Sequence, residues 1–139
     1  MLNEILIDAG PIIALFDKDD SYHEKILKFI KDKGFRFVTT TAVVTEVSHM
    51  LDFNVNVQIQ FLEWIEKDGI RLHEVKQKDI IEIIEMTKKY KDRPMDFADA
   101  TLVIAAKRTG IKKIISIDSD FDIYRLPSKE LIENIFRGS

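Results

Sequence analysis

The sequence contains no cysteine among its 139 residues. This absence excludes disulfide bonds and thiolate metal sites, and it is compatible with a reducing compartment. Long apolar runs are missing as well, since no stretch approaches the ~18 apolar residues that cross a bilayer. The first apolar run contains Glu4 and Asp8 and follows no basic segment. We therefore predict no signal peptide and no membrane association, and we expect a cytoplasmic protein.

Glycine and proline are scarce, with five and three residues, and no linker, repeat or low-complexity segment interrupts the chain. The length and the 45% hydrophobic content predict one domain over residues 1–139 with its own core. The net charge of −3 argues against a general nucleic-acid coat, because such binding neutralises phosphates. It does not exclude a nucleic-acid enzyme, because a cluster of metal-binding carboxylates lowers the net charge by itself.

Short apolar segments alternate with helical patterns along the whole chain. This order predicts a single α/β domain with a mostly parallel central sheet of four to five strands. Right-handed crossovers would bring the carboxyl ends of the strands to one edge of that sheet. The tail, residues 131–136, fits an edge strand or a short helix. The expected strands are residues 5–7, 35–39, 70–75 and 112–118, and the expected helices are residues 11–16, 22–33 with Ser21 as cap, 42–51, 57–67, 78–91 and 95–109.

Asp8 ends the first expected strand and precedes Ala9, Gly10 and Pro11, which break it. Pro11 is suited to open a helix at Ile12. In open α/β sheets, ligands bind at the carboxyl ends of the strands, where Asp8 would lie. The alternative is that Asp8 is simply the N-cap of the following helix.

Further acids occupy equivalent places. Glu46 lies in the helix after the second strand, Asp96 and Asp99 open the helix before the fourth strand, and Asp118 ends that strand. Each also has a structural alternative. Glu46 suits the dipole of its helix, Asp96 and Asp99 have capping-box spacing, and Asp118 and Asp120 are common turn formers. Asp99 is distinct because buried alanine, leucine and valine surround it, and a cation best explains an acid in such a place.

Carboxylates packed together repel one another and raise each other's pKa values, so a fold tolerates them when a cation compensates. Oxygen ligands without cysteine select hard ions such as Mg²⁺ or Mn²⁺. Such ions keep several waters and reach substrate phosphates, as in nucleases. The acids therefore point to metal-dependent hydrolysis of a phosphodiester, if they converge.

The chain resembles PIN domains of the VapC-like ribonuclease toxin type along nearly its whole length. No single motif is specific, but their order and spacing match together. The motifs are Ile5-Leu6-Ile7-Asp8, Asp20-x-Tyr22-His23, Thr45-Glu46-Val47, Asp96-Phe97-Ala98-Asp99-Ala100-x-Leu102-Val103 and Ile115-Ser116-Ile117-Asp118-Ser119-Asp120-Phe121.

The resemblance implies a three-layer α/β/α fold and metal-dependent endoribonuclease activity with Mg²⁺ or Mn²⁺. It also implies frequent homodimers and a small antitoxin as partner. The family's acidic set falls on Asp8, Glu46, Asp99 and Asp118, with Asp96 and Asp120 as possible outer members.

The chain departs from the family pattern at two places. Ala9 and Gly10 replace a hydroxyl residue that often follows the first acid, and Ser116 replaces a threonine while keeping the hydroxyl near the expected site. A non-catalytic module that binds RNA or a protein is the alternative function. An aspartyl phosphatase is disfavoured, because it needs a second acid where Gly10 stands, and a phospho-accepting receiver is disfavoured on motif context.

Overall fold

The structure, a computed structural model, describes residues 3–93 and 95–136. Its centre is a five-stranded sheet in the order β3-β2-β1-β4-β5, in which every pair of neighbours is parallel. The predicted parallel α/β fold is thus confirmed, and the tail forms an edge strand rather than a helix. The strands are β1 (Glu4–Ile7), β2 (Arg36–Thr40), β3 (Ile70–His73), β4 (Lys113–Ile115) and β5 (Glu133–Asn134).

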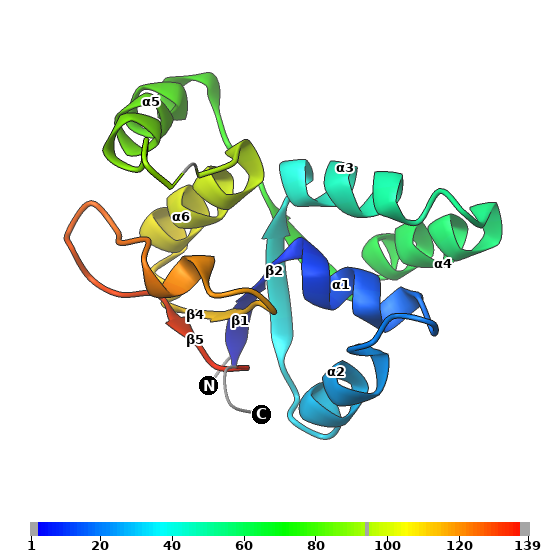
Figure 1. The fold of residues 1–139 in the computed structure, drawn as a ribbon. Helices are drawn as coiled ribbons and strands as arrows, with labels where there is room; N and C mark the ends of the chain where they lie inside the picture. The colour runs from blue at the N-terminus through cyan, green and yellow to red at the C-terminus, as the bar shows by residue number, and fades with distance from the viewer. Residues whose placement is uncertain (1–2, 94, 137–139) are drawn as a thin grey trace.

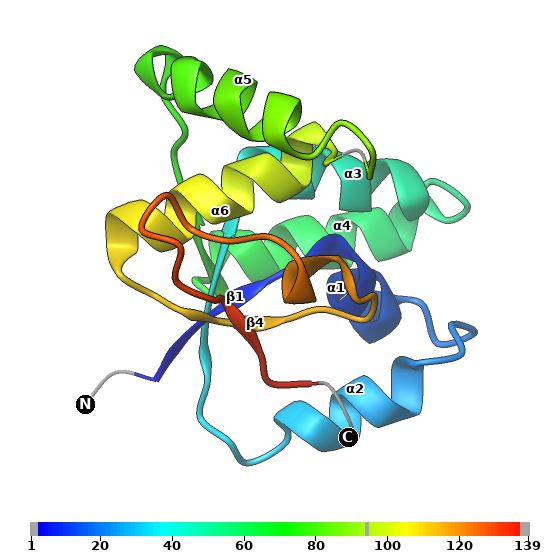
Figure 2. The ribbon, with the colours of Figure 1, turned by 60° about the vertical axis from the view of Figure 1, so that its left-hand side comes forward.

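Helices cover both faces of the sheet, which gives the predicted three layers. Figure 1 shows α5 and α6 on one side of the sheet and α1, α2 and α4 on the other. In the turned view of Figure 2, α5 lies outside α6, farther from the sheet. The helices are α1 (Ala9–Phe16), α2 (His23–Ile30), α3 (Thr41–Met50), α4 (Val55–Glu66), α5 (Ile80–Lys89) and α6 (Phe97–Thr109), with 3-10 turns η1 (Gln77–Asp79) and η2 (Asp120–Asp122).

The core explains why the central elements carry so few polar residues. Ile5, Leu6 and Ile7 of β1 are buried, as expected of a strand that has helices on both faces. Helix α6 is buried from Asp99 to Ala106, which confirms the predicted interior helix between the sheet and its neighbours. In the described ranges, no helix is both long enough and apolar enough to cross a membrane.

Each predicted helix start was wrong by one or two residues, and the first two helices illustrate this. Helix α1 begins at Ala9 with Asp8 as its N-cap, two residues before Pro11. Pro11 is nevertheless tolerated there, because the first backbone N–H groups of a helix have no partner within it. Helix α2 begins after Tyr22 rather than Ser21, and no side chain caps it.

The fourth strand is shorter than predicted, because it ends at Ile115 rather than at Asp118. The side chain of Asn134 in β5 makes hydrogen bonds to the backbone of Ser116, the residue that follows β4. Its Oδ1 accepts from the Ser116 N–H at 3.2 Å, and its Nδ2 donates to the Ser116 carbonyl at 3.0 Å. This side-chain clasp replaces ladder hydrogen bonds, so the chain leaves the sheet before Asp118.

Candidate active site

Strand β1 is the topological switch point of the sheet. It lies between β2 and β4, so the connections run to opposite sides from this strand, and ligands of open α/β sheets bind in the crevice at its carboxyl end. The backbone N–H of Asp8 donates to the Ile115 carbonyl at 3.1 Å. The first residue after β1 is therefore held beside the last residue of β4, and Asp118 follows three residues later.

Both oxygens of the buried Asp8 carboxylate have hydrogen-bond donors. Oδ1 accepts from the Ala9 N–H at 2.8 Å, and Oδ2 accepts from the Ser116 hydroxyl at 3.1 Å. The residue is 7% exposed. Burial, with added repulsion from Asp118 and Glu46, raises the pKa of Asp8 to about 7. Asp8 thus combines both predicted alternatives, because it caps α1 and also lies as a buried acid at the edge of the sheet.

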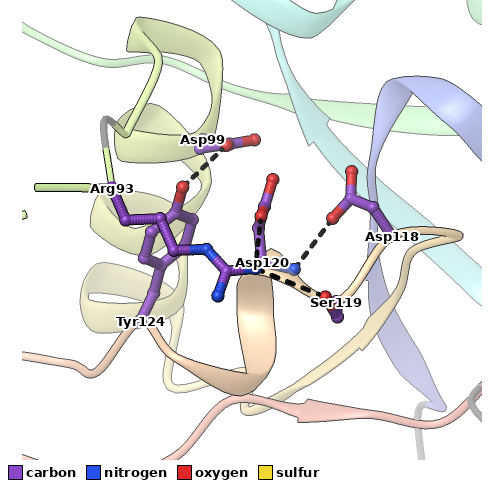
Figure 3. A network of polar contacts seen from close by, with 6 residues as sticks. All are labelled: Arg93, Asp99, Asp118, Ser119, Asp120 and Tyr124. Carbon is purple, nitrogen blue, oxygen red and sulfur yellow. Dashed lines mark hydrogen bonds and ion pairs between the residues drawn. The ribbon is translucent and has the colours of Figure 1, made fainter.

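Asp99 enters the same space from the first turn of α6. Its N–H donates to the Asp96 carboxylate at 2.8 Å, so Asp96 is the N-cap of this helix. The Asp99 carboxylate accepts from the Tyr124 hydroxyl at 3.2 Å (Figure 3). Asp99 is 8% exposed. Burial raises its pKa to about 8, with further repulsion from Asp8, Asp96 and Asp118.

Glu46 and Asp118 form the exposed rim of the site. Asp118 Oδ1 accepts from the Asp120 N–H at 3.0 Å, so it also fills the predicted turn-forming role. Partial burial and the charge of Asp120 raise the pKa of Asp118. Partial burial and the charges of Asp96 and Asp118 raise the pKa of Glu46 in α3. Acids from separate segments of the chain therefore share one electrostatic neighbourhood.

Asp120 differs from the other acids because a cation lies beside it. In Figure 3 the Arg93 guanidinium reaches the Asp120 carboxylate, at 3.5 Å, and the Ser119 hydroxyl, also at 3.5 Å. Both contacts are long, and the Arg93 side chain is 54% exposed. Asp120 is thus partly neutralised within the protein.

The other four acids, Asp8, Glu46, Asp99 and Asp118, which we call the inner acids, have no cation as partner in the described residues. None of the ion pairs within residues 3–93 and 95–136 involves Asp8, Glu46, Asp99 or Asp118. In the same residues, no three Asp, Glu or His side chains lie close enough to hold a metal ion directly. Four carboxylates and a hydroxyl nevertheless suit a hard divalent ion, and Mg²⁺ usually keeps several waters and takes only one or two protein carboxylates. The chemistry of the donors fits a hydrated ion.

Comparison with known proteins assigns the fold to a family. Residues 5–126 match the PIN domain family. The chain belongs to this family. Ribonuclease VapC26 of Mycobacterium tuberculosis is 23% identical over 116 residues, which are 82% of this chain and 86% of that protein. The predicted VapC-like PIN domain is therefore confirmed.

Two solved structures share the fold of this PIN domain. The crystal structure of M. tuberculosis VapC20, a toxin that cleaves the sarcin–ricin loop, has a TM-score of 0.77 at 19% identity and covers 85% of this chain and 92% of that chain. The crystal structure of VapBC2 from Rickettsia felis, bound to a DNA fragment from its promoter, has a TM-score of 0.64 at 10% identity. It covers 94% of this chain and 98% of that chain.

Three contacts between distant segments of this PIN domain were not predicted. They are the Tyr124 hydroxyl on Asp99, the Asn134 clasp on Ser116, and a buried hydrogen bond of 2.7 Å between the hydroxyls of Thr40 and Thr101. Thr40 is the N-cap residue of α3, yet its side chain makes no capping hydrogen bond. Its hydroxyl bonds to α6 instead, and no local pattern in the sequence signals such a long-range pair.

Proposed function

We propose that this PIN-domain protein is a divalent-metal-dependent endoribonuclease and the toxin of a toxin–antitoxin pair. The main support for the proposal is the group of inner acids at the switch point. Burial and their mutual repulsion raise their pKa values, and none of them has a cation partner in the described residues. The named activity of the similar VapC26 supports cleavage of RNA.

Asp8, Asp99, Asp118 and Glu46 are the residues we assign to surround a hydrated Mg²⁺ or Mn²⁺, of which one or two bind the ion directly and the others bind through its waters. When bound, such an ion lowers the pKa of water and neutralises charge on a phosphodiester. The Ser116 hydroxyl fixes Oδ2 of Asp8. The Glu46 carboxylate, which is exposed and has a raised pKa, is the group we assign to accept a proton from the attacking water.

The outer acids have a different part in this proposal. Asp96 caps α6 and thereby orients the turn that carries Asp99. Asp120 holds Arg93 at the edge of the acids. Because its contacts are long and its side chain is exposed, Arg93 is available to a phosphate of the RNA backbone next to the cleavage site.

We also propose an antitoxin and a second copy of the chain as partners, acting in the cytoplasm. Apolar side chains at two helix surfaces support this part. Val55, Ile59 and Leu62 form an exposed stripe at helical spacing on α4, and Ile81 and Ile84 are exposed on α5. Exposed apolar groups that gather on one face mark interaction surfaces. The VapBC2 complex among the similar structures also supports an antitoxin partner.

Cleavage of a 5′-labelled, mixed-sequence RNA tests the proposal. We expect cleavage with Mg²⁺ or Mn²⁺, and none with EDTA. Asp8→Asn should abolish it, because the variant keeps the size of the side chain and removes its charge. Asp52→Asn is the matched control, since Asp52 is exposed and lies just beyond α3. RNA binding without cleavage under all these conditions would favour a non-catalytic module instead.

A further inference from the structure

Tyr124 is a buried polar side chain whose polar atom faces the acids. The residue is 1% exposed and lies in the segment after η2. Its hydroxyl donates to Oδ2 of Asp99 at 3.2 Å, and Figure 3 shows it meeting Asp99 from the side opposite Asp118. The contact joins residues that are 25 positions apart in the sequence.

Aromatic packing fixes the Tyr124 ring in this position. The ring makes edge-to-face contacts with Tyr90, at 5.1 Å between centroids, and with Phe121, at 5.4 Å. Such pairs have preferred geometries, so the hydroxyl is held in one direction. The Tyr90 hydroxyl points elsewhere, since it accepts from the backbone N–H of Arg125 at 3.0 Å.

The Asp99 carboxylate differs from that of Asp8 in the number of hydrogen-bond donors that contact it. Both oxygens of Asp8 have donors, whereas Asp99 accepts from Tyr124 on Oδ2 alone among the described residues. A donor that occupies one carboxylate oxygen sets the rotation of the whole group. The second oxygen, Oδ1, is then fixed in direction, as a metal ligand needs to be.

We propose that Tyr124 is a positioning residue, which orients the Asp99 carboxylate so that its second oxygen binds the divalent ion. This inference rests on the proposed function, because it assumes that Asp99 takes part in metal binding. Hydrogen-bond partners behind metal ligands typically contribute 10- to 100-fold to metal affinity or activity. Tyr124 would belong to that class without touching RNA.

The test compares Tyr124→Phe with Tyr90→Phe in the full chain. Both variants remove one hydroxyl from rings that pack against each other, and only Tyr124 donates to an acid. Calorimetric titration with Mn²⁺ should show affinity about 10- to 100-fold weaker for Tyr124→Phe and within about twofold of the wild type for Tyr90→Phe. The kcat/KM for RNA cleavage should fall in parallel for Tyr124→Phe.

A double variant separates positioning from packing. In the Asp99→Ala background, Tyr124→Phe should weaken Mn²⁺ binding no further, because the hydroxyl acts through the lost carboxylate. Equal Mn²⁺ affinity of Tyr124→Phe and the wild type would overturn the inference, and so would an equal loss in Tyr90→Phe. A wild-type chain that neither binds Mn²⁺ nor cleaves RNA would contradict the proposed function itself.

A measurement on the wild type covers the case in which Tyr124→Phe does not fold. The chain contains three tyrosines, so ¹³C at tyrosine Cζ gives three NMR signals. Mg²⁺, which is diamagnetic, should shift the Tyr124 signal more than those of Tyr22 and Tyr90. A Tyr124 signal that stays unchanged while Mg²⁺ binds would overturn the inference.

Discussion

Replacing Asp99 with asparagine should stabilise the metal-free protein while abolishing its activity. Burial and neighbouring acids raise the pKa of Asp99 from 3.8 to about 8. Because the pKa in the folded state lies above the unfolded value, ionisation of this carboxyl destabilises the fold. The penalty is absent below about pH 4 and complete above about pH 8.

The magnitude follows from this shift. About four pKa units correspond to a ceiling of about 5 kcal/mol at pH 8. The asparagine side chain would still offer an oxygen to the Tyr124 hydroxyl, but an amide donor left without a partner costs about 1–3 kcal/mol. The net gain is therefore at most about 2–4 kcal/mol, or up to about 10 °C in Tm for a chain of this size.

Thermal unfolding in EDTA between pH 5 and pH 8.5 measures the effect, with Asp52→Asn as control. The Tm difference between Asp99→Asn and the wild type should grow as the pH rises, since only the wild type ionises at this position. Mn²⁺ should raise the Tm of the wild type and narrow that difference. An Asp99→Asn variant less stable than the wild type at pH 8, or a difference independent of pH, would refute the reasoning.

Three further outcomes are expected. Mg²⁺ should raise the Tm more at pH 8 than at pH 6. At pH 6 the ion must displace protons from Asp8 and Asp99, because their pKa values are about 7 and about 8. An equal rise in Tm at both pH values would contradict this prediction. Asn134→Leu should lower the free energy of unfolding in urea by about 2–3 kcal/mol, because it removes the hydrogen bonds to Ser116, and Glu133→Gln should not. Thr101→Val should cost about 1–3 kcal/mol in the same assay, since it leaves the buried Thr40 hydroxyl unpaired, and adding Thr40→Val should restore part of that loss.

The layers of the fold were predictable because they follow from apolar patterns. Three consecutive apolar residues before Asp8 indicate a strand covered on both faces, and α6 is apolar nearly all round. Once the sheet is parallel, its topology brings the strand ends to one edge. Asp8 at the end of β1, the start of α6 with Asp99 and the segment after β4 with Asp118 therefore meet, although they are far apart in the sequence.

The supporting contacts were not predictable from local patterns. The end of β4 depends on Asn134, 18 residues further along the chain, and the orientation of Asp99 depends on Tyr124. Thr40 has the composition of a helix cap, yet it pairs with a residue 61 positions away. Such contacts arise from packing between elements, for which neither spacing nor residue type gives a signal.

The clasp between β4 and β5 also bears on the order in which the site assembles as the chain folds. Asn134 holds Ser116, and the Ser116 hydroxyl holds Asp8, so the position of this acid depends on contacts between segments far apart in the sequence. Contacts of this kind form slowly, because a long loop must close before they stabilise anything. The hydrogen bond on Oδ2 of Asp8 should therefore appear only once β5 has docked beside β4.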